Sequence, residues 1–260
     1  MTRVLLLSYQ RCGTSTYCDS FNLYHSKDDK YIPCMNEVYS QQYNICSKFI
    51  KKYNLSFDKL KNKDKKELTK SFLFALNSKI FILKYFPLAI QHFCLPKLTL
   101  NYIINACLTN KISVHFLYRK NVLNSTLSLL ISNFTNVWHK DKETIEKVDY
   151  NKILFSTQFL NDTINYHMNE IKMCFDYYSV FKKNNLISEE LVYENNIVNG
   201  NFAYSEYLPN YYGKLNDEND INIVLKNNPL IYDVLNKYLK LYNIKCSEEY
   251  ILQNDYSDNL

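Results

Sequence analysis

Glycine is scarce in this sequence, because the 260 residues include only 3. At an ordinary usage of roughly 7%, about eighteen would be expected in a chain of this length. The scarcity excludes collagen-like and glycine-rich proteins, and it argues against phosphate-binding loops that are built from several glycines. A loop that needs a single glycine is still allowed, and Gly13 follows directly after an apolar run.

The sequence also lacks the patterns of zinc-binding, secreted and membrane proteins. Its 8 cysteines form no C-x-x-C pair and no tight cluster with histidine, so we expect no metal and free thiols in a reducing compartment. The N-terminal apolar run at residues 4–7 is too short for a signal peptide, and no stretch is long enough for a membrane span. These absences predict a cytoplasmic protein.

No strong excess of one charge is present. The chain has 31 basic and 26 acidic residues, a net charge of +5, and only one local lysine cluster at residues 59–70. A nucleic-acid-binding protein usually shows a stronger basic stripe, so we expect no nucleic-acid partner.

Tyr (24) and Phe (15) are abundant together with Asn, Lys and Ile. AT-rich codons favour this set, so we attribute most of the aromatic excess to codon usage.

Four short β-rich runs, of which the first three are nearly continuous apolar runs, alternate with segments of helical periodicity. The expected strands are residues 3–9, 79–86, 111–118 and 190–194, and the expected helices between them are residues 39–53, 60–77, 97–108 and 121–134. Nearly continuous apolar runs are typical of central parallel strands, and this alternation predicts an α/β fold with a central parallel sheet flanked by helices. The hydrophobic content of 47% suffices for one large domain over residues 1–260.

The last third of the sequence predicts a helical C-terminal part. Residues 150–184 have apolar positions at three- and four-residue steps, which fits one bent helix or two packed helices. Residues 195–228 are polar and predict an extended loop. A final helix is expected from Pro229, with Asn228 as its cap, to about Tyr242. The long segment and this helix could mediate a homodimer.

The first expected strand runs into a segment suited to binding an anion, residues 8–16 (SYQRCGTST). A strand, a tight turn and a helix present free backbone amides and the positive end of the helix dipole. The candidate anion ligands are Arg11, Cys12, Gly13, Thr14, Ser15 and Thr16. The segment is not a Walker loop, because it lacks the second glycine and the lysine of G-x-x-x-x-G-K. An ordinary capped turn is the alternative interpretation.

A second candidate site follows the third expected strand. Arg119 leaves the sheet at its carboxyl end, where open α/β sheets bind ligands, and Ser128 lies on the helix that follows. The two side chains could bind a second phosphate. The alternative is a solvent-facing arginine and an unrelated helix-surface serine.

Together the two segments resemble the sulfotransferases that use 3′-phosphoadenosine-5′-phosphosulfate (PAPS), most closely the bacterial-type carbohydrate sulfotransferases. Residues 8–15 are similar to the family's first loop, (S/T)-x-P-(R/K)-(S/T)-G-(S/T)-(S/T), which binds the 5′-phosphosulfate. Arg119 and Ser128 are similar to the Arg and Ser that bind the 3′-phosphate. Residues 129–139 (LLISNFTNVWH) and 192–195 (VYEN) are similar to a Thr-Gly-x-Trp-His stretch and a late Tyr-Glu-Asp strand. The resemblance implies a three-layer, P-loop-like fold.

The sequence departs from the family pattern at three places. Gln10 stands where proline is usual, and Cys12 replaces a hydroxyl residue but keeps its backbone amide. Arg119 lies nine residues before Ser128, where eight is common, and Lys120 would satisfy the shorter interval. We favour Arg119 over Lys120 because a planar guanidinium suits a phosphate better than an ammonium group does.

The resemblance implies in-line transfer of a sulfuryl group from PAPS to a hydroxyl or amine, on a carbohydrate or glycolipid acceptor, without a metal. Arg11 would stabilise the charge on the leaving group, and the acceptor hydroxyl needs a base. Glu37 is our first choice, because residues 31–39 resemble the segment in which the family has a catalytic Glu. His25 and His92 are alternatives.

Three further residues are of interest, although ordinary structural roles explain them equally well. Lys84 ends the second expected strand, where the family often has Lys, and Trp138 with His139 could line a sugar site. Two other functions stay open, a nucleotide-dependent kinase with a degenerate loop and a catalytically silent scaffold that binds the cofactor.

Overall fold

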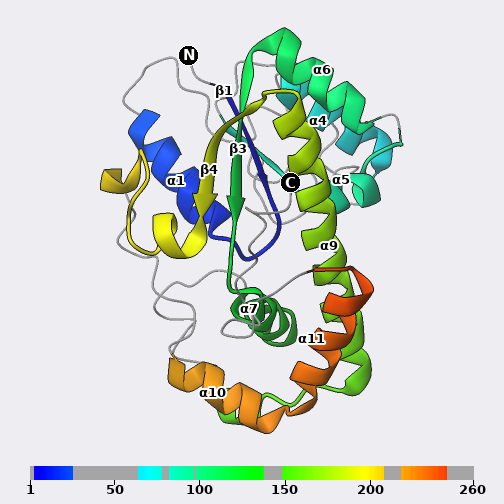
Figure 1. Cartoon of the computed structure of the whole chain (residues 1–260), viewed down its shortest axis with the longest axis vertical. Coiled ribbons are helices and arrows are strands. Elements are labelled where there is room, and N and C mark those ends of the chain that lie inside the picture. Colours follow the sequence, from blue (N-terminus) through cyan, green and yellow to red (C-terminus); the bar gives the residue numbers. More distant parts are fainter. Residues whose placement is uncertain are drawn as a thin grey trace.

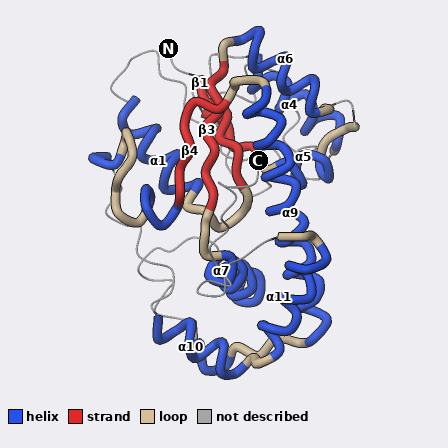
Figure 2. The backbone as a smooth tube through the Cα atoms, viewed as in Figure 1, coloured by secondary structure: helices blue, strands red, loops and turns tan. Residues whose placement is uncertain are grey.

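A four-stranded parallel sheet forms the centre of the protein in the computed structural model (Figures 1 and 2). The structure describes residues 3–25, 64–77, 82–96, 98–137, 148–207 and 218–244. The strands are β1 (Arg3–Ser8), β2 (Ile82–Tyr85), β3 (Ile112–Tyr118) and β4 (Ile187–Val192), in the order β2-β1-β3-β4. The expected α/β fold with a central parallel sheet is therefore confirmed.

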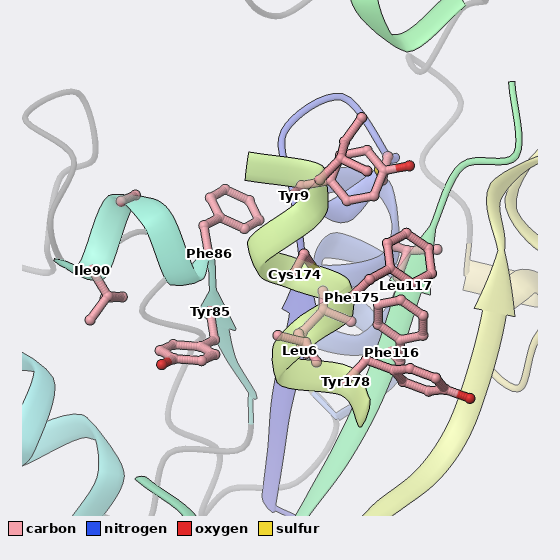
Figure 3. Close-up of a cluster of buried hydrophobic side chains, with 14 of the residues drawn as sticks. Leu6, Tyr9, Tyr85, Phe86, Ile90, Phe116, Leu117, Cys174, Phe175 and Tyr178 are labelled. Atoms are coloured by element: carbon pink, nitrogen blue, oxygen red, sulfur yellow. The ribbon is translucent and has the colours of Figure 1, made fainter. Parts of the chain in front are cut away.

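Helices cover both faces of the sheet and make three layers (Figure 1). Helix α1 (Thr14–His25) lies on one face, where the Tyr17 hydroxyl contacts Nδ1 of His115 on β3 at 2.7 Å. The opposite face is covered by α4 (Lys65–Asn77), α5 (Pro87–Phe93), α6 (Leu100–Asn110) and α9 (Thr157–Lys183). Figure 3 shows Tyr178 of α9 beside Phe116 of β3, with ring centroids 4.3 Å apart.

The central strands are apolar because both of their faces are covered. Leu5, Leu6 and Leu7 of β1 are fully buried, and β1 pairs with β2 on one side and with β3 on the other. A parallel strand in this position loses solvent contact on both faces, which explains a continuous apolar run instead of an alternating one. The strand signal in the sequence is strongest for this reason.

The carboxyl ends of the strands point toward a helical region below the sheet (Figure 1). It contains α7 (Val122–Thr135), α10 (Glu218–Asn227), α11 (Leu230–Leu241) and the lower part of α9. The expected helical C-terminal part is thus present. Helix α9 is a single helix of 27 residues, with Ser156 as its N-cap and a short 3-10 helix at Tyr150–Lys152 before it. None of the helices in the described ranges is both long and apolar enough to cross a membrane.

The prediction of an extended loop over residues 195–228 is wrong. The segment contains α10 as well as a π-helix, η2 (Tyr193–Ile197), and a 3-10 helix, η3 (Ser205–Tyr207). Its many asparagines have weak helix propensity, but α10 buries Val224 completely, and tertiary packing of this kind overrides propensity. Helix α5, which starts at Pro87 directly after β2, was not anticipated either.

Several element boundaries also differ from expectation; α6, for example, spans Leu100–Asn110, whereas residues 97–108 were expected. Strand β4 begins at Ile187 and ends at Val192, whereas residues 190–194 were expected. The Asn196 side chain accepts a hydrogen bond from the Val192 amide at 2.6 Å, which helps to turn the chain out of the sheet. Helix α11 begins at Leu230, and Asn228 does not cap it with its side chain.

Candidate functional site

The two segments singled out in the sequence lie at the same edge of the sheet. The chain runs from β1 to β2 on one side of β1 and then crosses to β3 on the other side, so the strand order reverses between β1 and β3. The loop after β1 and the turn after β3 flank this reversal at the carboxyl ends of the strands. In open α/β sheets, ligands bind at this position.

The loop after β1 leaves the first turn of α1 open to an anion. Arg11 and Gly13 both adopt left-handed backbone conformations, with φ of 68° and 76°. The Tyr17 amide donates to the Gly13 carbonyl at 3.1 Å, which makes Gly13 the residue that begins the helix. Glycine has no side chain to cap the helix, so the amides of residues 14–16 keep their capacity to bind an external acceptor. The turn with a single glycine that the sequence predicts is present, and its binding of an anion stays a prediction.

Only glycine fits at position 13. A Cβ atom there would lie 2.8 Å from Cδ2 and Cε2 of Tyr193 and 3.1 Å from Cγ2 of Ile197. Both contacts come from η2, so the π-helix packs directly against the loop. The positive φ of Gly13 adds a second reason, because side chains strain this conformation.

The two arginines predicted to bind phosphate meet at this loop. Nε of Arg11 donates to Oγ of Ser128 at 2.9 Å, and Nη1 of Arg119 donates to the carbonyl oxygen of Arg11 at 3.4 Å. Ser128 is buried on α7. Residues from β1, β3 and α7 are thereby brought together, as the sequence analysis anticipated, but it is Arg11 that directly contacts Ser128.

Arg119 is held by several contacts. The Tyr9 hydroxyl accepts from the Arg119 amide at 3.0 Å and donates to its carbonyl at 2.7 Å. The guanidinium carbon lies 4.4 Å from the ring centroid of Tyr193, in a cation–π contact, and Nε lies 3.6 Å from Oε1 of Glu194. Only 15% of the Arg119 side chain is exposed. A positioned arginine of this kind is preorganised for an anion.

Glu194 binds the turn that carries Arg119. Its Oε2 accepts from the Lys120 amide and its Oε1 from the Asn121 amide, both at 3.0 Å. The backbone of Lys120 therefore faces Glu194, whereas the guanidinium of Arg119 contacts both Glu194 and the loop. Residues 193 and 194 were noted in the sequence only as part of a resembling strand, and the structure places both against the candidate site.

Lys84 also reaches the loop. It lies on β2, is fully buried, and donates from Nζ to Oγ of Ser15 at 3.0 Å. The sequence pointed to Lys84 only as a strand-end residue. The structure adds it as a third cationic side chain beside Arg11 and Arg119, at the ends of three adjacent strands.

The remaining predicted residues lie in varied places. Thr14 is buried and Thr16 is half-buried in the first turn of α1. The Cys12 thiol is buried, with Sγ 3.9 Å from the Gln10 carbonyl, and burial raises its pKa, so only its backbone can serve the site. His25 packs against the ring of Phe21 at 4.4 Å.

Of the residues proposed to act on the acceptor, the structure describes only His25 and His92. His92 is exposed on α5. Glu37, Trp138 and His139 lie outside the described residues. Within the described ranges, no group of three His, Cys, Asp or Glu side chains is arranged to hold a metal ion.

The comparisons with known proteins identify no relative at the level of sequence. No protein-family model matches the chain, and no curated protein sequence matches it significantly. The resemblance to PAPS sulfotransferases therefore rests on the sequence motifs alone.

Proposed function

We propose that this protein is a PAPS-dependent sulfotransferase. One observation carries the proposal: Arg11 of the loop after β1 contacts both Ser128 and Arg119, at the reversal of strand order. PAPS carries a 5′-phosphosulfate and a 3′-phosphate on one ribose, so it needs two neighbouring anion sites. The loop amides with Arg11 and Lys84 provide one site, and Arg119 with Ser128 provides the other.

The same residues suit the chemistry of sulfuryl transfer. An acceptor oxygen or nitrogen forms a bond to sulfur while the bond between sulfur and the bridging phosphate oxygen breaks, and 3′-phosphoadenosine-5′-phosphate (PAP) leaves with the electron pair. Negative charge grows on the bridging oxygen, where cationic side chains and helix amides stabilise it. Lys84 and Arg11 are our candidates for this role. The acceptor proton passes to a base, and Glu37 stays our prediction for it.

The acceptor in this proposal is a hydroxyl or amine of a carbohydrate or glycolipid. This part rests on the resemblance of residues 129–139 and 31–39 to carbohydrate sulfotransferases. Residues 138 and 139, which could line a sugar site, belong to the first of these segments.

A ligand pair tests the nucleotide site directly. PAP has a 3′-phosphate and adenosine 5′-monophosphate (AMP) lacks it, so a residue that binds this phosphate affects only PAP. Arg119→Ala is expected to weaken PAP binding in calorimetry by about 10- to 150-fold, since hydrogen bonds to charged groups contribute about 1.5–3 kcal/mol. AMP affinity should change by less than about threefold. Lys120→Ala is the matched control and should change neither.

The alternatives give different results. If Lys120→Ala selectively weakens PAP binding, Lys120 is the 3′-phosphate ligand. If neither variant does, the phosphate site is misplaced. The wild type should transfer label from radiolabelled PAPS to a member of a glycan panel, and binding without any transfer would support the silent scaffold. A rise in melting temperature with ATP and Mg²⁺, but not with PAP, would support a kinase.

A further inference from the structure

A buried carboxylate that the proposed mechanism does not use contacts the anion loop. Glu170 lies on α9 and is completely buried. Its Oε2 accepts a hydrogen bond from the Gln10 amide at 3.1 Å. Its Oε1 has no hydrogen-bond partner among the residues that the structure describes. A buried carboxylate with an oxygen that accepts no hydrogen bond lowers the stability of the fold. Its contact with the loop therefore indicates a role in the site.

Glu170 belongs to a polar network between the two candidate phosphate sites. Nδ1 of the fully buried His167 lies 3.5 Å from Oε2 of Glu170, and Nε2 of His167 lies 3.0 Å from Oγ of Ser125. Ser125 is on α7, one turn before Ser128, and its hydroxyl donates to the Val122 carbonyl. The network therefore connects α9 to the loop after β1 and to the helix after β3.

The hydrogen bond between Glu170 and the Gln10 amide restrains the backbone directly before Arg11. Arg11 follows Gln10 and has a φ of 68°, which is unfavourable for a residue with a side chain. This conformation is what allows Nε of Arg11 to reach Ser128. Proline, which is usual at position 10 of the resembling loop, has no amide hydrogen and could not make the bond to Glu170. Gln10 and Glu170 thus form a pair.

We propose that Glu170 is a positioning residue for the anion loop, whose carboxylate oxygen holds the Gln10 amide and thereby keeps Arg11 directed at Ser128. The effect of Glu170 on nucleotide binding and transfer rests on the proposed function. The loop geometry on which it depends can be measured without any nucleotide.

Two conservative variants of Glu170 separate the effect of its hydrogen bond to Gln10 from the effect of its charge. Glu170→Gln keeps the side-chain length and an oxygen that can accept from Gln10, but it removes the charge. Glu170→Asp keeps the charge but withdraws the oxygen from the Gln10 amide by one methylene. Asp176→Asn is the matched control, because it removes an exposed carboxylate of the same helix that pairs with Lys172.

The first readout is the Nε–H signal of Arg11 in protein labelled with ¹⁵N-arginine. The chain has only three arginines, Arg3, Arg11 and Arg119, so the spectrum is simple, and loss of a signal in Arg11→Lys identifies it. Glu170→Asp should shift the Arg11 signal, whereas Glu170→Gln and Asp176→Asn should leave it near its original position. Arg3 is an internal control at the opposite end of the sheet, where it donates to the carbonyls of Asn110 and Leu76.

The second readout is PAP affinity by calorimetry. Glu170→Asp should raise the Kd by about 10-fold, the equivalent of one weakened charge-assisted contact, and Glu170→Gln by less than about threefold. A wild-type Arg11 signal in Glu170→Asp overturns the inference, as does a Glu170→Gln protein that behaves like Glu170→Asp. If the wild type does not bind PAP, the proposed function fails, and the Arg11 signal alone then decides whether Glu170 positions the loop.

Discussion

Replacing Gly13 by alanine tests the packing of the anion loop. The new Cβ would lie 2.8 Å from two ring carbons of Tyr193, and the backbone would remain at a φ of +76°. Distances below about 3.0 Å are not tolerated by real Cβ atoms, so the Tyr193 ring or the loop must move. Both belong to the candidate site, because the Tyr193 ring also lies against the Arg119 guanidinium.

Two terms set the expected loss of stability. The left-handed conformation disfavours alanine by about 1–2 kcal/mol, and overpacking in a filled interior costs about 1–3 kcal/mol. Gly13→Ala should therefore lower the free energy of unfolding by about 2–5 kcal/mol. In the Tyr193→Ala background the clash with the ring disappears and only the 3.1 Å contact with Ile197 remains. Gly13→Ala should then cost mainly the backbone term of about 1–2 kcal/mol relative to Tyr193→Ala.

Urea unfolding of the wild type, the two single variants and the double variant measures this coupling. Gly200→Ala is the matched control, because Gly200 has a similar φ of +67° outside the loop. Gly13→Ala should also weaken PAP binding. Equal losses in the presence and absence of the Tyr193 ring, with a coupling below about 0.5 kcal/mol, would refute the reasoning.

Two further predictions concern other parts of the fold. The buried side chain of Asn228 accepts from the Phe155 amide at 2.7 Å and donates to two carbonyls, so Asn228→Ala should lower the free energy of unfolding by about 2–4 kcal/mol in urea. The half-buried Asn227 makes one hydrogen bond, to the Asn151 carbonyl, and Asn227→Ala should cost less than about 1 kcal/mol. Burial lowers the pKa of His115 from 6.5 to about 4, so the stability it gives above pH 6.5 is lost as the pH falls toward 4. Burial raises the pKa of the neighbouring Glu189, so the contribution of Glu189 to stability increases as the pH falls, opposite to that of His115. Because Glu189 is present in both proteins, a comparison of wild type with His115→Gln isolates the contribution of His115. Between pH 7 and 4.5 the wild type should lose about 2 kcal/mol more than the variant, and equal losses would contradict the assignment.

The parallel strands were the most predictable part of the fold. Strands β1 and β3 agree with the sequence to within one residue at each end, because strands buried on both faces appear as uninterrupted apolar runs. Edge strand β4 was harder, since it exposes charged residues such as Glu190 and its end depends on a side-chain contact from Asn196. Helix α10 was missed because its asparagines give a weak helical signal and its stability comes from packing.

The residues of the candidate site could be named from the sequence, but the long-range contacts that hold them in place could not. Arg11, Gly13, Arg119 and Ser128 were named from two short motifs whose spacing is local. Glu170 was not, although a signal existed: it lies three residues after His167, on the buried stripe of α9. A charged residue on an apolar stripe is unusual enough to justify attention.

By itself the sequence determined the alternation of strands and helices and pointed to the two candidate motifs, because apolar periodicity and turn chemistry act between residues that are close in the chain. Only the tertiary structure decided that Arg11 contacts Ser128, that Tyr193 excludes any side chain at Gly13, and that Glu170 holds the loop. These contacts join residues 117, 180 and 160 positions apart. Contacts over such separations depend on how strands and helices pack, and no local pattern specifies them.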